Sequence, residues 1–135
     1  MFYLQPPSFT TMKILTIDDQ LLVTFSVQRI LSNRGYTVET ASDGLEGIKM
    51  FEQFQPDLVI VDYNMPRMNG VEVIEYIRVK RNSKIPILIM SGSTDVTIKE
   101  KGFELGIADY LPKPVDLNKL VHSVSDLFER AKIAI

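Results

Sequence analysis

The sequence predicts an α/β fold, in which five parallel strands form a doubly wound sheet with helices on both faces. Two observations support this prediction. Apolar runs of about four to six residues recur along the chain, as in strands that are buried on both faces of a parallel sheet. Helix-length segments with amphipathic spacing separate these runs, which is the alternation of a repeated βα unit.

The five predicted strands are apolar runs bounded by charged, glycine or proline residues. They cover residues 13–17, 37–40, 58–61, 87–90 and 108–111. The run Leu-Val-Ile-Val at 58–61 contains no polar residue, so we expect it at the centre of the sheet.

Five segments with apolar residues at helical spacing are the predicted helices. They cover residues 21–34, 45–54, 70–80, 95–105 and 116–132. Gly35 is suited to end the first helix, and Pro56 prevents continuation of the second. Asp116 is a plausible N-cap for the last helix.

Two of these helices depend on weaker signals. The inward face of the helix at 45–54 would include Leu45. The segment 95–105 contains Gly102, which disfavours a helix, and we therefore expect this helix to be loosely formed.

Right-handed crossovers allow this order of elements to form the flavodoxin-like strand order 2-1-3-4-5. We expect a single domain over residues 12–135, because the pattern begins directly after Met12. Residues 1–11 would be an N-terminal extension or an expression remnant. The last helix ends the chain, so we expect no output domain.

Charge and composition exclude several classes of function. The 135 residues carry a net charge of −2 with acidic and basic residues interspersed, which predicts no direct nucleic-acid or membrane partner. The absence of cysteine excludes disulfides and thiolate metal sites. The sequence shows neither a signal peptide nor an apolar stretch near the ~20 residues of a membrane span, and we expect a cytoplasmic protein.

Polar side chains lie where the predicted strands end. Asp18 and Asp19 follow the first strand, Asp62 the third and Ser91 the fourth, whereas Lys113 lies just beyond the fifth. Taken singly, such an aspartate is usually an N-cap or a turn residue, and such a lysine is usually solvated. Because ligands bind at the carboxyl ends of the strands in this architecture, however, we expect these side chains to share one crevice.

Three carboxylates in one crevice predict a metal site. At 4 Å and an effective dielectric near 20, each pair repels by on the order of 4 kcal/mol, which a cation or protonation must relieve. Mg²⁺, with Mn²⁺ as an alternative, suits ligation by oxygen atoms alone. Asp18 and Asp19 would hold the ion, and the backbone carbonyl of Asn64 would add a ligand.

The same crevice predicts phosphoryl chemistry. Asp62 is the most central carboxylate and is therefore the candidate nucleophile, which would become an acyl phosphate. Lys113 would supply a positive charge to the phosphoryl group, and Ser91 would supply a hydroxyl donor.

Four segments resemble the receiver domain of two-component response regulators, and the resemblance covers about residues 12–132. The segments are Ile-Asp-Asp (17–19), Val-Asp-Tyr-Asn-Met-Pro-Arg-Met-Asn-Gly (61–70), Met-Ser-Gly (90–92) and Asp-Tyr-Leu-Pro-Lys-Pro (109–114). The resemblance implies the same five-stranded doubly wound fold.

The resemblance also implies a role for each acidic residue. Asp62 would accept a phosphoryl group from the phosphohistidine of a sensor histidine kinase or a phosphotransfer protein. Asp18 and Asp19 would bind Mg²⁺ together with Asp62 and the Asn64 carbonyl. The domain would catalyse only its own phosphoryl transfer and dephosphorylation, and would not be an enzyme acting on other substrates.

The remaining matched positions imply a switch. Ser91 matches the hydroxyl that moves toward the phosphoryl group, and Tyr110 matches the aromatic residue that swings inward. Lys113 matches a lysine whose peptide bond to the following proline, here Pro114, is often cis. Ser93 and Asn64 would flank the path of the hydrolytic water. The surface of helix four, strand five and helix five would then change its affinity for a downstream protein effector, in a monomer or a phosphorylation-dependent dimer.

Three alternatives remain. A phosphate-independent receiver-like binding module would usually have lost an acidic or lysine position, and this chain has them all. An aspartate-nucleophile phosphatase usually carries a second aspartate two residues after the nucleophile, where this chain has Asn64. A flavin-binding protein would need a phosphate loop after the first strand, where Asp18 and Asp19 would repel the cofactor phosphate.

Overall fold

The computed structural model describes residues 11–133. Strands and helices alternate along this range as predicted. Residues 1–10, which make up nearly all of the predicted N-terminal extension, lie outside the described residues. Within the described range, no helix has the length and apolar character needed to cross a membrane.

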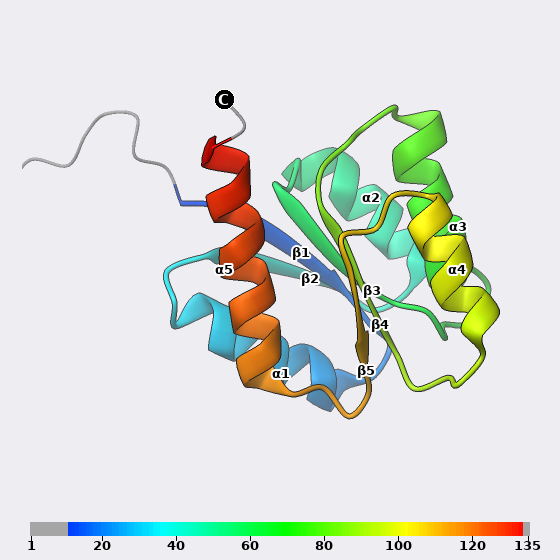
Figure 1. The fold of residues 1–135 in the computed structure, drawn as a ribbon, viewed down its shortest axis with the longest axis horizontal. Helices are drawn as coiled ribbons and strands as arrows, with labels where there is room; N and C mark the ends of the chain where they lie inside the picture. The colour runs from blue at the N-terminus through cyan, green and yellow to red at the C-terminus, as the bar shows by residue number, and fades with distance from the viewer. Residues whose placement is uncertain (1–10, 134–135) are drawn as a thin grey trace, which may run out of the picture.

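Five parallel strands form one sheet in the order β2-β1-β3-β4-β5, which confirms the predicted topology (Figure 1). The strands are β1 (Lys13–Ile17), β2 (Thr37–Ala41), β3 (Leu58–Asp62), β4 (Ile87–Ser91) and β5 (Asp109–Pro112). β3 and β4 are buried along their whole length, which explains why their sequences are almost wholly apolar.

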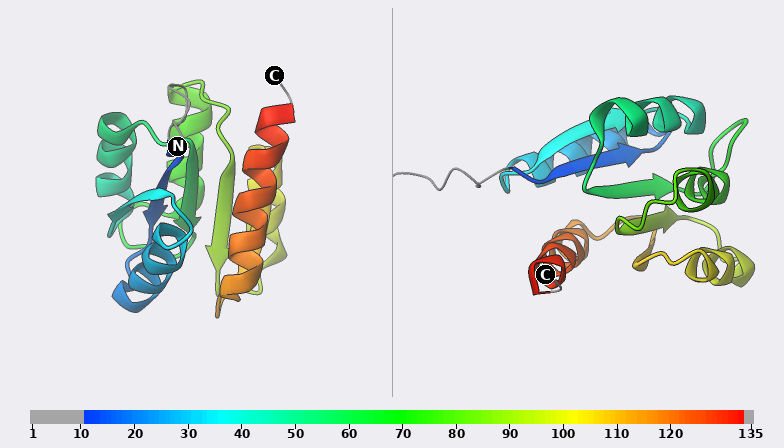
Figure 2. Two further views of the ribbon diagram at one scale, coloured as in Figure 1. Left: turned by 90° about the vertical axis from the view of Figure 1, so that its left-hand side faces the viewer. Right: turned by 90° about the horizontal axis from the view of Figure 1, so that it is seen from above.

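Helices cover both faces of the sheet (Figures 1 and 2). The helices are α1 (Leu21–Ser32), α2 (Gly44–Phe54), α3 (Gly70–Glu75), α4 (Val96–Glu104) and α5 (Leu117–Ile133). Apolar residues of α1 and α5 form one buried cluster with the sheet, whereas a second cluster lies on the opposite face, beneath α2, α3 and α4. The sheet is therefore the middle of three layers, with α1 and α5 on one face and α2, α3 and α4 on the other.

The predicted helix at 70–80 differs from the structure, because α3 continues as a π-helical turn, η1 (Tyr76–Lys80). Within this wider turn the N–H of Arg81 donates to the carbonyl of Tyr76, five residues earlier, at 3.0 Å. The guanidinium of Arg78 donates from the turn to three backbone carbonyls of neighbouring segments. These acceptors are Ser83, Leu105 and Gly106.

Glycines explain how α2 and α4 pack. A Cβ atom at Gly102 would lie 2.7 Å from Cδ1 of Ile107 and 2.9 Å from Cδ1 of Ile89, so this glycine lets α4 approach the sheet directly. The α2 helix likewise buries Gly44 and Gly47. Leu45, expected to point inward, is instead 54% exposed, and the inward side of α2 consists of these glycines together with Met50, Phe51 and Phe54.

The loop between β3 and α3 is fixed at both ends. The N–H of Gly70 donates to the carbonyl of Tyr63 at 2.9 Å, and Asn69 forms a capping box with Glu72 at the start of α3. A Cβ atom at Gly70 would lie 2.6 Å from the carbonyl oxygen of Asp62, which is main chain and cannot rotate away. Gly70 therefore holds α3 against the last residue of β3.

Replacing Gly70 with alanine should lower the free energy of unfolding by about 1–3 kcal/mol, since the new methyl group overpacks against rigid backbone. Denaturant unfolding followed by circular dichroism would measure this change.

The matched control is Gly92→Ala, where the nearest atom to the new methyl group, Cβ of Lys113, is 3.9 Å away. This variant should unfold within about 0.5 kcal/mol of the wild type. Equal stability of the two variants would contradict the close approach at Gly70.

Candidate functional site

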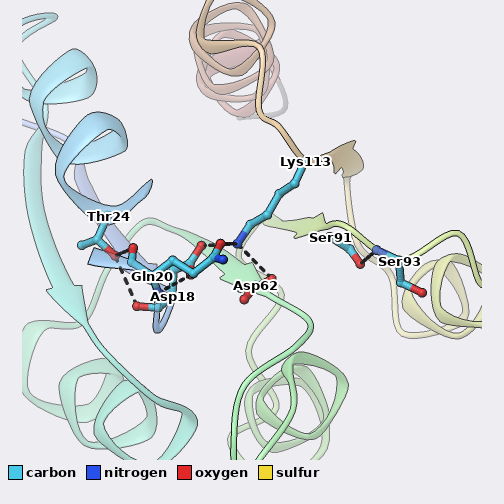
Figure 3. Close-up of polar contacts among 7 residues, drawn as sticks. All are labelled: Asp18, Gln20, Thr24, Asp62, Ser91, Ser93 and Lys113. Carbon is cyan, nitrogen blue, oxygen red and sulfur yellow. Dashed lines mark hydrogen bonds and ion pairs between the residues drawn. The ribbon is translucent and has the colours of Figure 1, made fainter. Parts of the chain in front are cut away.

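The carboxyl edge of the sheet brings together the side chains that the sequence placed there. Asp18 directly follows β1, Asp62 is the last residue of β3, Ser91 is the last of β4, and Lys113 directly follows β5. Because β1 and β4 flank β3, Asp18 and Ser91 lie on either side of Asp62 (Figure 3).

Three carboxylates form a compact cluster that could hold a metal ion. One carboxylate oxygen each from Asp18, Asp19 and Asp62 lies within 4.8 Å of the others. Asp18 is fully buried and Asp62 is 2% exposed, whereas Asp19 is open to solvent. The cluster therefore has two buried carboxylates and one that faces the entrance.

The two oxygens of Asp18 differ in their partners. Oδ1 accepts a hydrogen bond from the N–H of Gln20 at 2.9 Å. Oδ2 is buried and, among the residues that the structure describes, is without a hydrogen-bond partner, although Lys113 Nζ lies 2.8 Å away as an ion pair. A buried carboxylate oxygen in this state fits the all-oxygen ligand set of a hard divalent cation.

The ammonium group of Lys113 is the counter-charge of this cluster (Figure 3). Its Nζ atom lies 2.8 Å from Oδ2 of Asp18 and 3.4 Å from Oδ1 of Asp62, and it donates to Oε1 of Gln20 at 2.7 Å. The Lys113–Pro114 peptide bond is cis. One cation therefore contacts both buried carboxylates.

Burial and the nearby charge of Asp18 raise the pKa of the Asp62 carboxyl from 3.8 to about 6, and Lys113 partly opposes this rise. The raised pKa means that the folded protein favours the neutral form of Asp62 more than the unfolded chain does. Much of the carboxyl is still ionised at neutral pH, so Asp62 can act as a nucleophile there.

Ser91 is buried, and its hydroxyl is connected to the loop that leads to α4. Oγ of Ser91 accepts from the N–H of Ser93 at 3.0 Å, and Oγ of Ser93 accepts from the N–H of Asp95 at 3.0 Å. Asp95 in turn caps α4 by accepting from the N–H of Thr97. The hydroxyl at the site is thus linked to the start of α4 by successive hydrogen-bonded turns.

Tyr110 is half-buried beside the same loop. Its hydroxyl donates to the carbonyl of Ser93 at 3.4 Å, and Nζ of Lys99 lies 5.8 Å from the centroid of its ring. The side chain therefore connects β5 with the β4–α4 loop and with α4 itself.

Asn64 lies at the entrance to the cluster. It is exposed and lines a pocket of about 200 Å³ in front of the carboxylates. The other residues that line this pocket are Asp19, Gln20, Asp62, Gly92 and Lys113.

Sequence reasoning did not identify Gln20 as part of the site. Its position directly after the aspartate pair, where α1 begins, was the available signal. Arg67 was also missed. Its ion pair with Asp43, at 2.8 Å, connects the loop after Asp62 to the N-terminus of α2.

Comparison with protein families gives one match that covers most of the chain. The family model described as the response regulator receiver domain matches residues 14–125. Among curated proteins, response regulator MprA of Mycobacterium leprae (strain TN) is 38% identical over 121 residues, which is 90% of this chain and 53% of that protein. This chain spans about half the length of the curated relatives it matches.

Solved structures give the same result. The chemotaxis response regulator CheY4 of Vibrio cholerae is 32% identical, with a TM-score of 0.80, over 87% of this chain and 99% of that one. The N-terminal domain of an uncharacterized protein (WS1339) from Wolinella succinogenes is 30% identical, with a TM-score of 0.84, over 92% of this chain and 98% of that one.

The raised pKa of Asp62 predicts how stability depends on pH when no divalent ion is present. A rise from 3.8 to about 6 corresponds to on the order of 2–3 kcal/mol of lost stability once the carboxyl is ionised. This loss is absent below about pH 4, develops as the pH rises, and is complete above about pH 6. Asp62→Asn should therefore be more stable than the wild type at pH 7.5 and nearly equal to it at pH 4.

Chemical denaturation in EDTA across this pH range would measure the difference. Asn64→Ala, which leaves the carboxyl in place, should show the pH dependence of the wild type. A difference between Asp62→Asn and wild type that stays constant with pH would contradict the raised pKa.

Proposed function

The chain belongs to the response regulator receiver family of two-component signalling, and from this premise we propose that it is a phosphorylation-activated switch whose phosphoryl acceptor is Asp62. One observation carries the proposal. The Asp62 carboxylate is almost fully buried at the end of the central strand, with an ammonium at 3.4 Å and two further carboxylates beside it. This combination supports a nucleophile that is held next to cationic groups.

We propose that Asp18, Asp19 and Asp62, with the backbone carbonyl of Asn64, hold Mg²⁺. The donor set consists of oxygens alone, and Oδ2 of Asp18 is buried without a hydrogen bond. Both facts fit Mg²⁺, which binds oxygen ligands and keeps several waters. When bound, the ion would neutralise charge on the oxygens of the phosphoryl group.

The proposed reaction is a transfer from phosphohistidine to Asp62. A carboxylate oxygen of Asp62 attacks phosphorus, the P–N bond breaks with its electron pair left on the imidazole nitrogen, and a P–O bond forms. Lys113 exchanges a carboxylate contact for a phosphoryl oxygen and so stabilises the transferred charge. Later attack of water on phosphorus breaks the acyl phosphate, releases inorganic phosphate and restores the carboxylate, so the domain acts only on its own phosphoryl group.

The connections of Ser91 support the proposed switch. The phosphoryl group carries about −1.5 to −2 charge on three acceptor oxygens, in place of the single charge of the carboxylate, and the Ser91 hydroxyl turns to donate to one of them. Its link to the N–H of Ser93 then changes, and with it the loop that leads to α4. Tyr110, bonded to the carbonyl of Ser93, moves inward with this loop. The surface of α4, β5 and α5 thereby changes its affinity for a downstream protein effector or for a second copy of the chain.

We propose that the phosphohistidine partner, a sensor histidine kinase or a phosphotransfer protein, docks on α1. Leu21, Leu22 and Phe25 of this helix are 69%, 82% and 68% exposed. An apolar pocket of about 350 Å³, lined in part by Leu22, shares Gln20 and Lys113 with the pocket in front of the carboxylates, which we call the acidic pocket. A partner that places its imidazole over Asp62 would cover this apolar surface.

With Mg²⁺ and acetyl phosphate, the protein should gain the mass of one phosphoryl group, measured by intact mass spectrometry. The gain should disappear in Asp62→Asn and in EDTA. Stable uptake of phosphate by Asp62→Asn would refute the assignment of the acceptor. If the wild type gains no mass from acetyl phosphate and none from a phosphohistidine donor, a phosphate-independent binding module is the better account.

The donor for this test is an autophosphorylated sensor histidine kinase that phosphorylates the wild type. Transfer from it should be more than about tenfold slower in the double variant Leu22→Ser, Phe25→Ser, because the variant removes the apolar anchors of docking. Uptake from acetyl phosphate, which needs no docking, should stay within about twofold. Radiolabelled transfer measured on gels would compare the two donors. Equal loss with both donors, or with neither, would argue against docking on α1.

A further inference from the structure

We propose that Gln20 is a positioning residue, which holds the Lys113 ammonium over the acidic pocket while the partners of Asp18 and Asp62 change. The inference rests on the proposed function, because it concerns the lysine that would meet the phosphoryl group. It gives a role to the Gln20 side chain, which lines the pocket but makes no capping bond to α1.

The contacts of Lys113 show how its ammonium is shared. Oε1 of Gln20 is its nearest acceptor at 2.7 Å, followed by Oδ2 of Asp18 at 2.8 Å and Oδ1 of Asp62 at 3.4 Å. An ammonium has three donors and here faces three acceptors. Of these three contacts, the one with Gln20 is a hydrogen bond, whereas those with Asp18 and Asp62 are ion pairs.

Gln20 differs from the other two acceptors in charge. Its amide is neutral and is not part of the carboxylate cluster, whereas Asp18 and Asp62 supply the oxygens that a cation would take. A cation at the cluster competes with Lys113 for those two carboxylates but not for Oε1 of Gln20. The glutamine contact is therefore the one that is able to persist as the carboxylates change partners.

The backbone of Gln20 is fixed in the position that this role needs. Its N–H donates to Oδ1 of Asp18 at 2.9 Å, and its carbonyl accepts from the N–H of Thr24 at 3.0 Å in the first turn of α1. The residue thus connects one buried carboxylate through its main chain and the lysine through its side chain (Figure 3).

Helix capping does not account for the side chain. Gln20 stands at the N-cap of α1, where serine, threonine, aspartate and asparagine are preferred, and its side chain makes no capping bond. Without Gln20, the flexible stem of Lys113 would have only the carboxylates to hold it at the pocket, which is open to solvent. A cation at the cluster would then release the ammonium from its position.

Two variants separate the acceptor from the bulk of the side chain. Gln20→Met keeps a similar length but removes the oxygen acceptor, whereas Gln20→Glu keeps an oxygen at the same reach but gives it the charge for which a cation competes. Gln53→Met, on the exposed side of α2, is the control for the substitution itself.

The first readout is the ¹⁵N-edited NMR signal of the Lys113 ammonium in saturating Mg²⁺, assigned by its loss in Lys113→Arg. The signal should be sharp in the wild type and in Gln53→Met, and broadened or lost by fast exchange with water in Gln20→Met. In Gln20→Glu it should be sharp only without the cation. The second readout is phosphoryl uptake from phosphoramidate, which should be slower by about fivefold in Gln20→Met, as expected from the loss of one hydrogen bond.

An ammonium signal in Gln20→Met as sharp as that of the wild type would overturn the proposal, whatever the rate of uptake. A wild-type rate of uptake in Gln20→Met would also overturn it. If the wild type takes up no phosphate from phosphoramidate, the proposed function fails instead, and the ammonium signal still decides whether Gln20 positions Lys113.

Discussion

The balance between two buried carboxylates and a single ammonium is the interaction on which the rest of the site depends. Asp18 and Asp62 are buried carboxylates that repel each other, and Lys113 contacts both of them. Removing Lys113 would leave two buried carboxylates without a counter-charge. Breaking a buried ion pair in this way typically costs roughly 3–5 kcal/mol, so the lysine holds the carboxyl ends of β1 and β3 and the segment after β5 together. Burial and the charge of Asp18 keep the pKa of Asp62 raised against the opposing charge of Lys113. One positive charge does not offset the three carboxylates, so the pocket favours a further cation.

The fold positions this charge cluster through close main-chain contacts. Parallel pairing of β1, β3, β4 and β5 places their last residues side by side, and the pairing of Asp62 with Met90 sets Ser91 one step beyond it. Gly70 brings α3 against the end of β3, and Gly102 brings α4 against Ile89 of β4. The hydroxyl oxygen of Ser91 accepts from the N–H of Ser93 in the loop before α4. We therefore expect phosphorylation of Asp62 to change the contacts of the β4–α4 loop first.

Much of this architecture could be predicted from the sequence, because its strongest signals are local. The apolar run before Asp62 and the spacing of glycines and prolines define the order of strands and helices, and parallel pairing then brings the acidic residues together. Geometry between distant segments could not be predicted in this way. Arg78 of the π-helical turn at Tyr76–Lys80 donates to the carbonyls of Leu105 and Gly106, and the contact between Gln20 and Lys113 joins residues 93 positions apart. The inward side of α2 was also misjudged at Leu45, since the fully buried residues in the first half of this helix are Gly44 and Gly47, which carry no hydrophobic signal.

The central claim is that the chain carries its phosphoryl group as an acyl phosphate on Asp62. Reduction of the phosphorylated protein with borohydride, followed by peptide mass spectrometry, tests this claim most directly, because it converts an aspartyl phosphate into homoserine at the modified position. We predict homoserine at residue 62 and at no other aspartate. Homoserine at Asp18 or Asp19, or a stable phosphoester on Ser91, would contradict the account.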